Sequence, residues 1–116
     1  MEARVLKRRA AAGSFEELDL RVGRITSVAI AMTRKPTYRL TIDFGPEIGE
    51  RVSCGAYRNY PPGTLVGRLV VAAVNLGERR MGPEVSEVLT LGVTNMNGET
   101  IYLTPESDVP LGAPVF

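Results

Sequence analysis

Hydrophobic and polar residues alternate along much of this chain with a period of two, which is the pattern of β-strands that bury one face. The clearest example is segment 38–44, where Tyr, Leu, Ile and Phe alternate with Arg, Thr and Asp. Segment 20–32 alternates in the same way, but its parity slips around Gly23, and a β-bulge at this glycine explains the slip. Both segments are therefore predicted to be strands.

Further segments complete a set of five principal strands. Segment 52–54 is a short strand, segment 68–76 is apolar enough to be buried on both faces, and segment 88–93 follows the polar loop 77–87. Proline and glycine at 61–63 break the regular structure before the fourth strand. Five strands with turn signals between them, and no sustained helical period, predict an all-β fold closed or partly closed into a barrel.

A hairpin is predicted where Asn97-Gly98 separates the fifth strand from another β-type segment, 101–104. Asn-Gly is typical of a two-residue type I′ turn, because both of its residues tolerate a positive φ. A type I′ hairpin is therefore expected at this position.

The two ends of the chain lie outside these strands. Residues 1–13 carry basic residues and alanines but little apolar surface, which predicts a basic arm or short helix. Ser14, three residues before Glu17, fits a capping box and predicts a short N-terminal helix at the start of a domain that spans 14–116. The C-terminal segment 105–116 is extended but too apolar to stay in water, so we expect it to pack and to serve as a dimerisation segment.

The composition is that of a globular protein with one core. The chain has 116 residues, of which 44% are hydrophobic and 23% are charged. Its longest apolar runs are far shorter than the roughly 20 residues of a membrane-spanning helix, so no membrane insertion is expected. The basic start lacks the apolar stretch of a signal peptide, and the single cysteine allows no intramolecular disulfide. These features predict a cytoplasmic location.

The chemistry of an enzyme is missing from the sequence. There is no histidine to act as a general base or as a metal ligand. Cys54 has no histidine partner and falls on a predicted strand, where a buried structural cysteine is the commoner case. No glycine-rich nucleotide loop of the common types occurs. We therefore predict a binding module that is not an enzyme and that needs no cofactor and no metal.

Charge is segregated along the chain although the formal net charge is only +1. One stretch without an acidic residue contains Arg21, Arg24, Arg34, Lys35 and Arg39. Every charged residue after Arg80 is acidic. Arginine dominates the basic residues, and its planar, multidentate guanidinium suits phosphate and stacking on bases. The bland alternative for any single arginine is surface solubility. The grouping favours a phosphate-bearing ligand.

Four motifs follow one another along the chain: Phe-Glu-Glu-Leu-Asp-Leu-Arg-Val-Gly-Arg-Ile at 15–25, Ile-Asp-Phe-Gly-Pro-Glu-Ile-Gly at 42–49, Val-Asn-Leu-Gly-Glu-Arg-Arg-Met-Gly at 74–82 and Ser-Glu-Val-Leu-Thr-Leu-Gly at 86–92. In this order they resemble the tRNA-binding domain family, whose fold is an oligonucleotide-binding (OB) barrel. Within the family, the chain is most similar to the CsaA group, described as dimeric chaperones linked to protein export. It departs from that group at 52–57, where CsaA proteins tend to carry Gln-Ser-Ser-Ala-Gln.

The resemblance implies a five-stranded OB barrel, a homodimer and a tRNA that lies across the pair. It places the ligand surface on the second and third strands and on two loops. On that surface Arg34, Lys35 and Arg39 would face the ligand. Carried over by position, the residues of the other wall would be Asn75, Arg79, Arg80, Met81, Ser86 and Glu87. Met81 could instead pack a loop, Ser86 could cap a turn, and Glu87 could be a solvated strand edge or could orient Arg79 or Arg80.

Three functions follow from these observations. The leading one is a non-catalytic homodimer that recognises the shape and backbone of folded tRNA with limited base readout. The second is a CsaA-like chaperone that binds unfolded or export-destined peptides through apolar contacts. The third is a structural subunit that docks on a synthetase.

Overall fold

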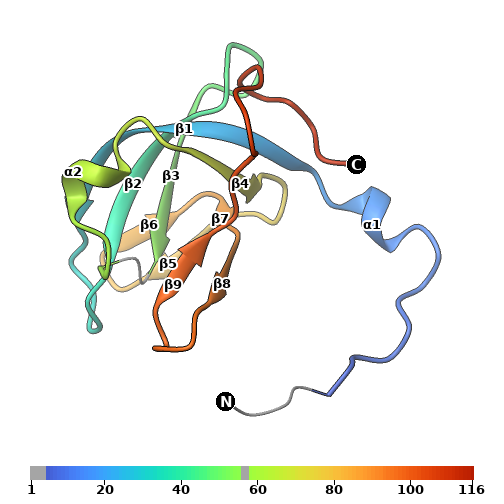
Figure 1. The fold of residues 1–116 in the computed structure, drawn as a ribbon, viewed down its shortest axis with the longest axis horizontal. Helices are drawn as coiled ribbons and strands as arrows, with labels where there is room; N and C mark the ends of the chain where they lie inside the picture. Colours follow the sequence, from blue (N-terminus) through green and yellow to red (C-terminus); the bar gives the residue numbers. More distant parts are fainter. Residues whose placement is uncertain (1–4, 56–57) are drawn as a thin grey trace.

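The computed structural model describes residues 5–55 and 58–116. Its main sheet is antiparallel, with the strand order β3-β2-β1-β4-β7. The strands are β1 (Leu20–Ile30), β2 (Tyr38–Asp43), β3 (Glu50–Gly55), β4 (Leu69–Ala73) and β7 (Leu89–Thr90). The sheet curls until its edge strands β3 and β7 come together, which gives a nearly closed barrel (Figure 1). The prediction of an all-β, five-stranded barrel is confirmed.

The barrel interior is filled by the residues that the alternation selected. In β2, Tyr38, Leu40 and Ile42 are buried, while the polar residues between them are half-buried. Because successive side chains of a strand point to opposite faces, this pattern fixes which face of the sheet is the core. The short helix α2 (Pro62–Leu65) lies between β3 and β4 and adds the fully buried Leu65 to the same core.

The β-bulge lies three residues later than Gly23. The β1–β4 register is continuous through Gly23, whereas the β1–β2 register shifts between Ile25 and Ser27. Gly23 is required for a different reason. A Cβ at this position would lie 2.5 Å from Ile42 Cγ2 and 2.7 Å from the Phe44 ring, so only glycine leaves room for the core to close.

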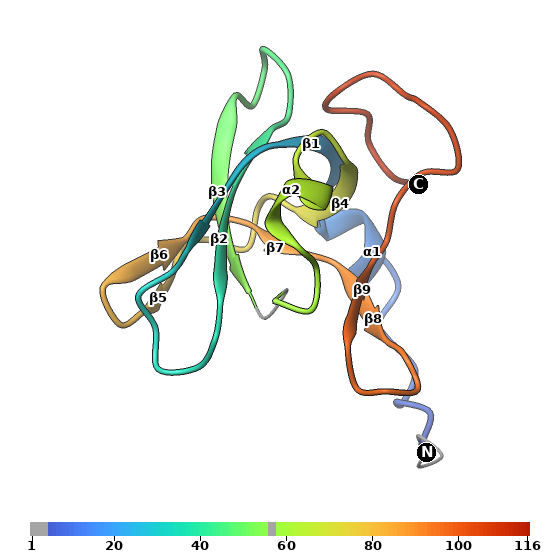
Figure 2. The ribbon, with the colours of Figure 1, turned by 60° about the vertical axis from the view of Figure 1, so that its left-hand side comes forward.

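Two small hairpins extend from the barrel on different sides (Figure 2). One consists of β5 (Arg79–Met81) and β6 (Glu84–Ser86), and the other of β8 (Gly92–Thr94) and β9 (Thr100–Tyr102). The sequence predicted a polar loop at 77–87, and this prediction is wrong because the segment contains the β5–β6 hairpin. Its strands have three residues each, too few for their alternation to stand out in a polar segment.

The turn between β8 and β9 is not of type I′. A type I′ turn needs positive φ at both central residues, but no described non-glycine residue, Asn97 included, has positive φ. Instead, the Gly98 amide donates to the Asn95 carbonyl at 3.1 Å. Among residues 95–99 of this turn, only Gly98 has a positive φ, of 78°. The Asn95 side chain accepts from the Asn97 and Glu99 amides, which stabilises this wider turn.

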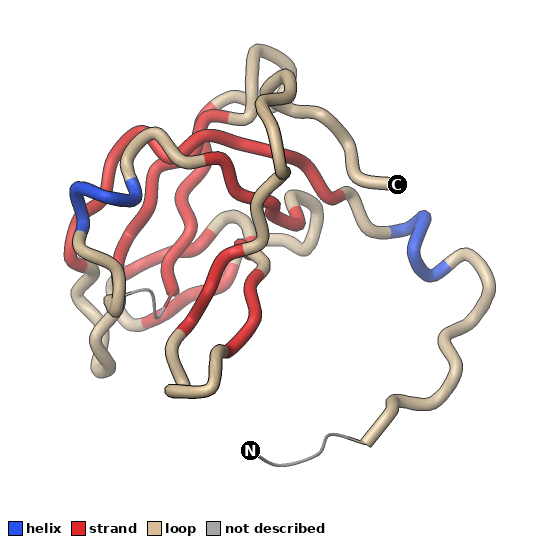
Figure 3. Tube along the Cα trace, in the orientation of Figure 1, coloured by secondary structure: helices blue, strands red, loops and turns tan. Residues whose placement is uncertain are grey.

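The N-terminal helix α1 (Ser14–Glu17) forms without the predicted capping box. Gly13 is the N-cap, with a left-handed backbone, and no side chain caps the helix. Ser14 is already inside the helix, so its hydroxyl cannot serve the first turn as an N-cap does. Residues 5–11 contain neither helix nor strand, and Figure 3 shows this arm leading away from the barrel.

The C-terminal segment packs on its own barrel. It runs along the first residues of β1, on the side where β2 pairs only from Arg24 onwards. There the Gly112 amide donates to the Val22 carbonyl at 2.8 Å and the Val115 amide donates to the Leu20 carbonyl at 2.9 Å. Gly112 approaches the Phe44 carbonyl so closely that a Cβ would lie 2.6 Å from that oxygen. Phe116 is left fully exposed. Within residues 5–55 and 58–116, no helix combines the length and the apolarity needed to cross a bilayer.

Candidate functional site

The β1–β2 loop, residues 31–37, presents the first pair of predicted contact residues. Arg34 and Lys35 are exposed, and neither side chain makes a hydrogen bond or ion pair to the described part of the chain. The loop is shaped by its own threonines, because Thr33 and Thr37 both donate through their hydroxyls to the Lys35 carbonyl, at 2.7 and 2.9 Å. Such local bonds give the loop a defined shape without a ligand.

Arg39 lies on β2 and forms an ion pair with Glu84 of β6. Its Nη1 atom is 3.0 Å from Oε1 and 3.1 Å from Oε2 of Glu84, while the Met32 amide donates to Oε2 at 2.8 Å. The bond from the Met32 amide and the adjacent guanidinium lower the pKa of the Glu84 carboxyl. Glu84 thereby joins the β1–β2 loop, β2 and the β5–β6 hairpin. The Arg39 side chain stays 41% exposed, so its other donors can reach solvent or a ligand.

The β5–β6 hairpin presents the second pair of cations. Arg79 and Arg80 are exposed and have no hydrogen bond or ion pair among the described residues. Since neighbouring strand residues point to opposite faces, Arg79 and the half-buried Met81 share one face and Arg80 occupies the other. The tip of this hairpin lies against the β1–β2 loop, where Gly82 approaches the Met32 carbonyl.

Arg58 is a cation that the sequence analysis missed. It is exposed, and it lines a groove between the β1–β2 loop and the tip of the β5–β6 hairpin together with Arg34 and Lys35. Its guanidinium carbon lies 5.7 Å from the centre of the Tyr38 ring. Nothing in the local sequence signals this role, because residue 58 follows β3 and reaches the β1–β2 loop only through the fold. A guanidinium over an aromatic ring is attracted by the ring's negative face, which helps to fix its position.

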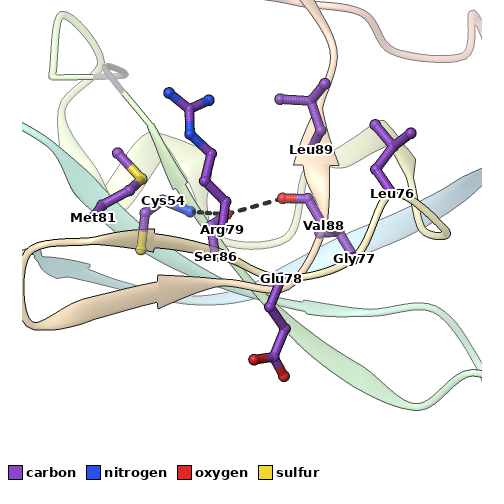
Figure 4. Close-up of a pocket in the computed structure, with 9 residues that line it drawn as sticks. All are labelled: Cys54, Leu76, Gly77, Glu78, Arg79, Met81, Ser86, Val88 and Leu89. Carbon is purple, nitrogen blue, oxygen red and sulfur yellow. Dashed lines mark hydrogen bonds between the residues drawn. The ribbon is translucent and has the colours of Figure 1, made fainter.

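Ser86 and Glu87 close the barrel between β3 and the segment after β6. Ser86 Oγ accepts from the Cys54 amide and donates to the Val88 carbonyl, both at 3.0 Å (Figure 4). Glu87 Oε1 accepts from the Val52 amide at 2.9 Å, and the Glu87 amide donates to the Val52 carbonyl at 2.7 Å. Side chains thus replace part of a backbone ladder. The Glu87 carboxylate binds Val52 rather than orienting Arg79 or Arg80.

Asn75 lies apart from the cations, at the end of β4. Its Oδ1 accepts from the Asp19 amide at 2.9 Å and its Nδ2 donates to the Glu17 carbonyl at 2.8 Å. These bonds attach α1 to the barrel. The surrounding apolar surface, here called the terminal patch, consists of the half-buried Leu20 and of exposed Phe15, Leu18, Pro114, Val115 and Phe116.

A small cavity of about 180 Å³ lies between β3 and the β5–β6 hairpin. Its walls include Leu76, Met81 and Leu89, and Figure 4 shows the Arg79 side chain beside it, with Glu78 pointing away from Arg79. Cys54 is buried at this cavity, and burial raises the pKa of its thiol. A protonated, buried thiol behaves as a small apolar group rather than as a nucleophile.

The topology and these cations define an OB-like barrel with a basic surface on one loop and one hairpin. The chain belongs to the tRNA-binding domain family, because the family model described as "Putative tRNA binding domain" matches residues 20–114.

Known proteins resemble this chain in sequence and in structure. It is 34% identical over 99 residues to methionine–tRNA ligase 1 of Sorangium cellulosum (strain So ce56), a match that covers 84% of this chain but 14% of the ligase. The crystal structure of chaperone CsaA from Bacillus anthracis str. Ames superposes with a TM-score of 0.86 at 34% identity, covering 93% of this chain and 99% of that one. The CsaA chaperone protein from Picrophilus torridus gives 0.87 at 32% identity, covering 93% and 100%.

Proposed function

We propose that this protein is a non-catalytic, cytoplasmic homodimer that binds folded tRNA through one continuous basic surface. Arg34, Lys35, Arg79 and Arg80 supply cations without partners in the described part of the chain. The observation that carries the proposal is the Glu84 contact to Arg39 and Met32, because it holds the loop and the hairpin with these cations in one arrangement. Membership of the tRNA-binding domain family supports tRNA as the ligand.

The predicted contact residues divide into two groups under this proposal. Arg34, Lys35, Arg39, Arg79, Arg80 and Met81 contact the ligand, which reaches both faces of the β5–β6 hairpin because Arg79 and Met81 lie on one face and Arg80 on the other. Asn75, Ser86 and Glu87 support the fold without contacting the ligand, because their polar side-chain atoms are bonded to backbone groups of the barrel and of α1. Phosphate contacts position a nucleic acid without reading its sequence, so we expect many tRNAs to bind with similar affinity.

The salt dependence of binding tests this proposal. Each phosphate contact that is lost should reduce the slope of log K against log salt by about one. Arg34→Ala, Lys35→Ala and Arg80→Ala should therefore each weaken binding of total tRNA and reduce this slope. Arg68→Ala is the matched control, because it removes an exposed arginine beside α2, outside the proposed surface.

Filter binding at several salt concentrations gives affinity and slope together. Equal affinity and equal slope for the wild type and for all three surface variants would refute the basic surface. Thermal unfolding of each variant checks that the substitutions act on binding rather than on folding.

The proposed dimer rests on the terminal patch. Phe116 is fully exposed and Phe15 is 49% exposed, and they come from opposite ends of the chain but line the same hollow. Apolar surface of this kind marks an association site, and a two-fold dimer would cover it symmetrically. Deleting the whole tail would also remove the bonds to β1, so Phe15→Ser with Phe116→Ser is the cleaner test. Light scattering should show a dimer for the wild type and a monomer for this double variant.

A specific observation favours peptide binding as a second candidate. The cavity beside Cys54 has apolar walls from Leu76, Met81, Val88 and Leu89, with Arg79 at its side. Such a lining could take an apolar side chain of an unfolded peptide, as a CsaA-like chaperone would require. Apolar capture is not weakened by salt, unlike phosphate binding. Leu89→Ser should lower capture of a denatured polypeptide and leave tRNA binding unchanged if both ligands are bound.

A further inference from the structure

The groove between the β1–β2 loop and the tip of the β5–β6 hairpin combines cations with exposed apolar groups. Arg34, Lys35 and Arg58 line it, and none of its ten lining residues is acidic. Glu84, which follows the lining residue Pro83 in the chain, is already bonded to Arg39 and to the Met32 amide. The groove therefore carries net positive charge and is complementary to an anion.

The apolar part of the groove is not needed to bind a duplex backbone. Ile30 is 60% exposed and Met32 is 71% exposed, and Pro36 and Pro83 also line the groove. Phosphates along a paired helix would contact the cations alone, and the apolar side chains would stay in water. A ligand that uses both parts needs a flat apolar face next to a phosphate, as an unpaired nucleotide has.

The groove is largely formed before a ligand arrives. The Met32 amide is held by Glu84, the Ala31 amide donates to the Thr37 carbonyl at 3.0 Å, and Arg58 rests over the Tyr38 ring. Its volume of about 650 Å³ falls within the roughly 300–1,000 Å³ of small-ligand sites. Pre-organisation of this kind reduces the entropy that binding would otherwise cost.

We propose that this groove is a subsite for one unpaired nucleotide, with the base against Ile30 and Met32 and its phosphate on Arg34, Lys35 and Arg58. The inference rests on the proposed tRNA-binding function and adds to it. It assigns the loop end of the surface to a looped-out or terminal nucleotide, and leaves the paired regions of the RNA to Arg79 and Arg80.

The test compares an RNA oligonucleotide of about eight nucleotides, within the site size of one OB barrel, with an abasic ribose-phosphate chain of the same length. Met32→Ser removes apolar contact without changing charge, and its backbone bond to Glu84 is retained. Met96→Ser is the matched control, because Met96 is an 86% exposed methionine at the tip of the β8–β9 hairpin. Arg58→Ala tests the phosphate contact. Fluorescence anisotropy at several salt concentrations gives the affinities.

Met32→Ser should weaken binding of the oligonucleotide about fivefold or more, with an unchanged salt slope, because a stacked base is lost and no phosphate contact is. The abasic chain should bind the wild type and Met32→Ser equally. Arg58→Ala should reduce the salt slope for both chains by about 0.7, as expected for one phosphate of a single strand. Met96→Ser should match the wild type throughout.

Three outcomes would overturn the subsite. If Met32→Ser matched Met96→Ser on every RNA while the arginine variants weakened total tRNA, the groove would contact backbone only and the proposed function would stand. If a peptide rich in glutamate and leucine bound with Met32-dependent affinity and the oligonucleotide did not bind, the groove would belong to an acidic peptide instead. A wild-type protein that bound no tRNA at all would refute the proposed function, and the subsite with it.

Discussion

Replacing Ser86 by alanine should weaken the fold and leave tRNA binding intact. Ser86 is buried, and its hydroxyl bonds the Cys54 amide of β3 and the Val88 carbonyl across the closure of the barrel. Alanine removes both bonds at once. Leaving the buried Cys54 amide without its acceptor and the Val88 carbonyl without its donor should cost about 1–3 kcal/mol, because water cannot replace the missing hydroxyl.

The expected change in melting temperature follows from the size of the chain. The entropy of unfolding is about 2.1 cal/mol/K per residue, so the 116 residues give about 0.24 kcal/mol/K. A loss of about 1–3 kcal/mol then lowers the melting temperature by about 4–12 °C. Differential scanning calorimetry measures the shift, and the affinity for total tRNA is measured well below the transition.

The matched control is Ser27→Ala, since Ser27 is an exposed serine on β1. It should change the free energy of unfolding by no more than about 0.5 kcal/mol. The reasoning fails if Ser86→Ala melts like this control but binds tRNA more weakly. That result would make Ser86 a ligand contact, as the family resemblance implied.

Three further predictions concern the core and the buried charge. Cys54→Ser should keep tRNA binding. Because burial raises the pKa of the Cys54 thiol, the wild type should lose stability to urea as pH rises above the ordinary thiol pKa, and the variant should not. Gly23→Ala places a Cβ 2.5 Å from the buried Ile42 and should cost about 1–3 kcal/mol in the same assay, and a neutral result would contradict the close packing. In the wild type, the lowered pKa of the Glu84 carboxyl stabilises the fold above the carboxyl's unfolded-state pKa of about 4.3, and this stability is lost on acidification. Glu84→Gln should therefore show a smaller fall in melting temperature than the wild type below about pH 4.3.

Much of the barrel could be read from local patterns. The alternation of 38–44 located a strand and its buried face, and the proline and glycine at 61–63 located a break that the structure fills with α2. These signals are local, since they depend on the period of two and on the dihedral limits of proline. The exposure of Arg34 and Lys35 followed from the same kind of reasoning, because a polar loop between two strands lies at the surface.

The position of the bulge and the form of the hairpin turn were not local in this sense. The parity slip lay near Gly23, but the register change was absorbed between Ile25 and Ser27, where β1 leaves β4 and pairs with β2. Likewise Asn97-Gly98 suited a type I′ turn, but the Asn95 side chain bonded two later amides and favoured a wider turn. In each case a partner outside the dipeptide or the strand decided the outcome.

The sequence by itself determined the barrel, its core face, the family and the chemistry of the cations, because each depends on residue type and short spacing. Only the tertiary structure decided which polar side chains are free to meet a ligand. Ser86 and Glu87 close the barrel, Asn75 attaches α1, and Arg58 joins Arg34 at the groove. A hydrogen-bonding side chain satisfies whichever buried partner the fold brings to it, and that partner is distant in the sequence.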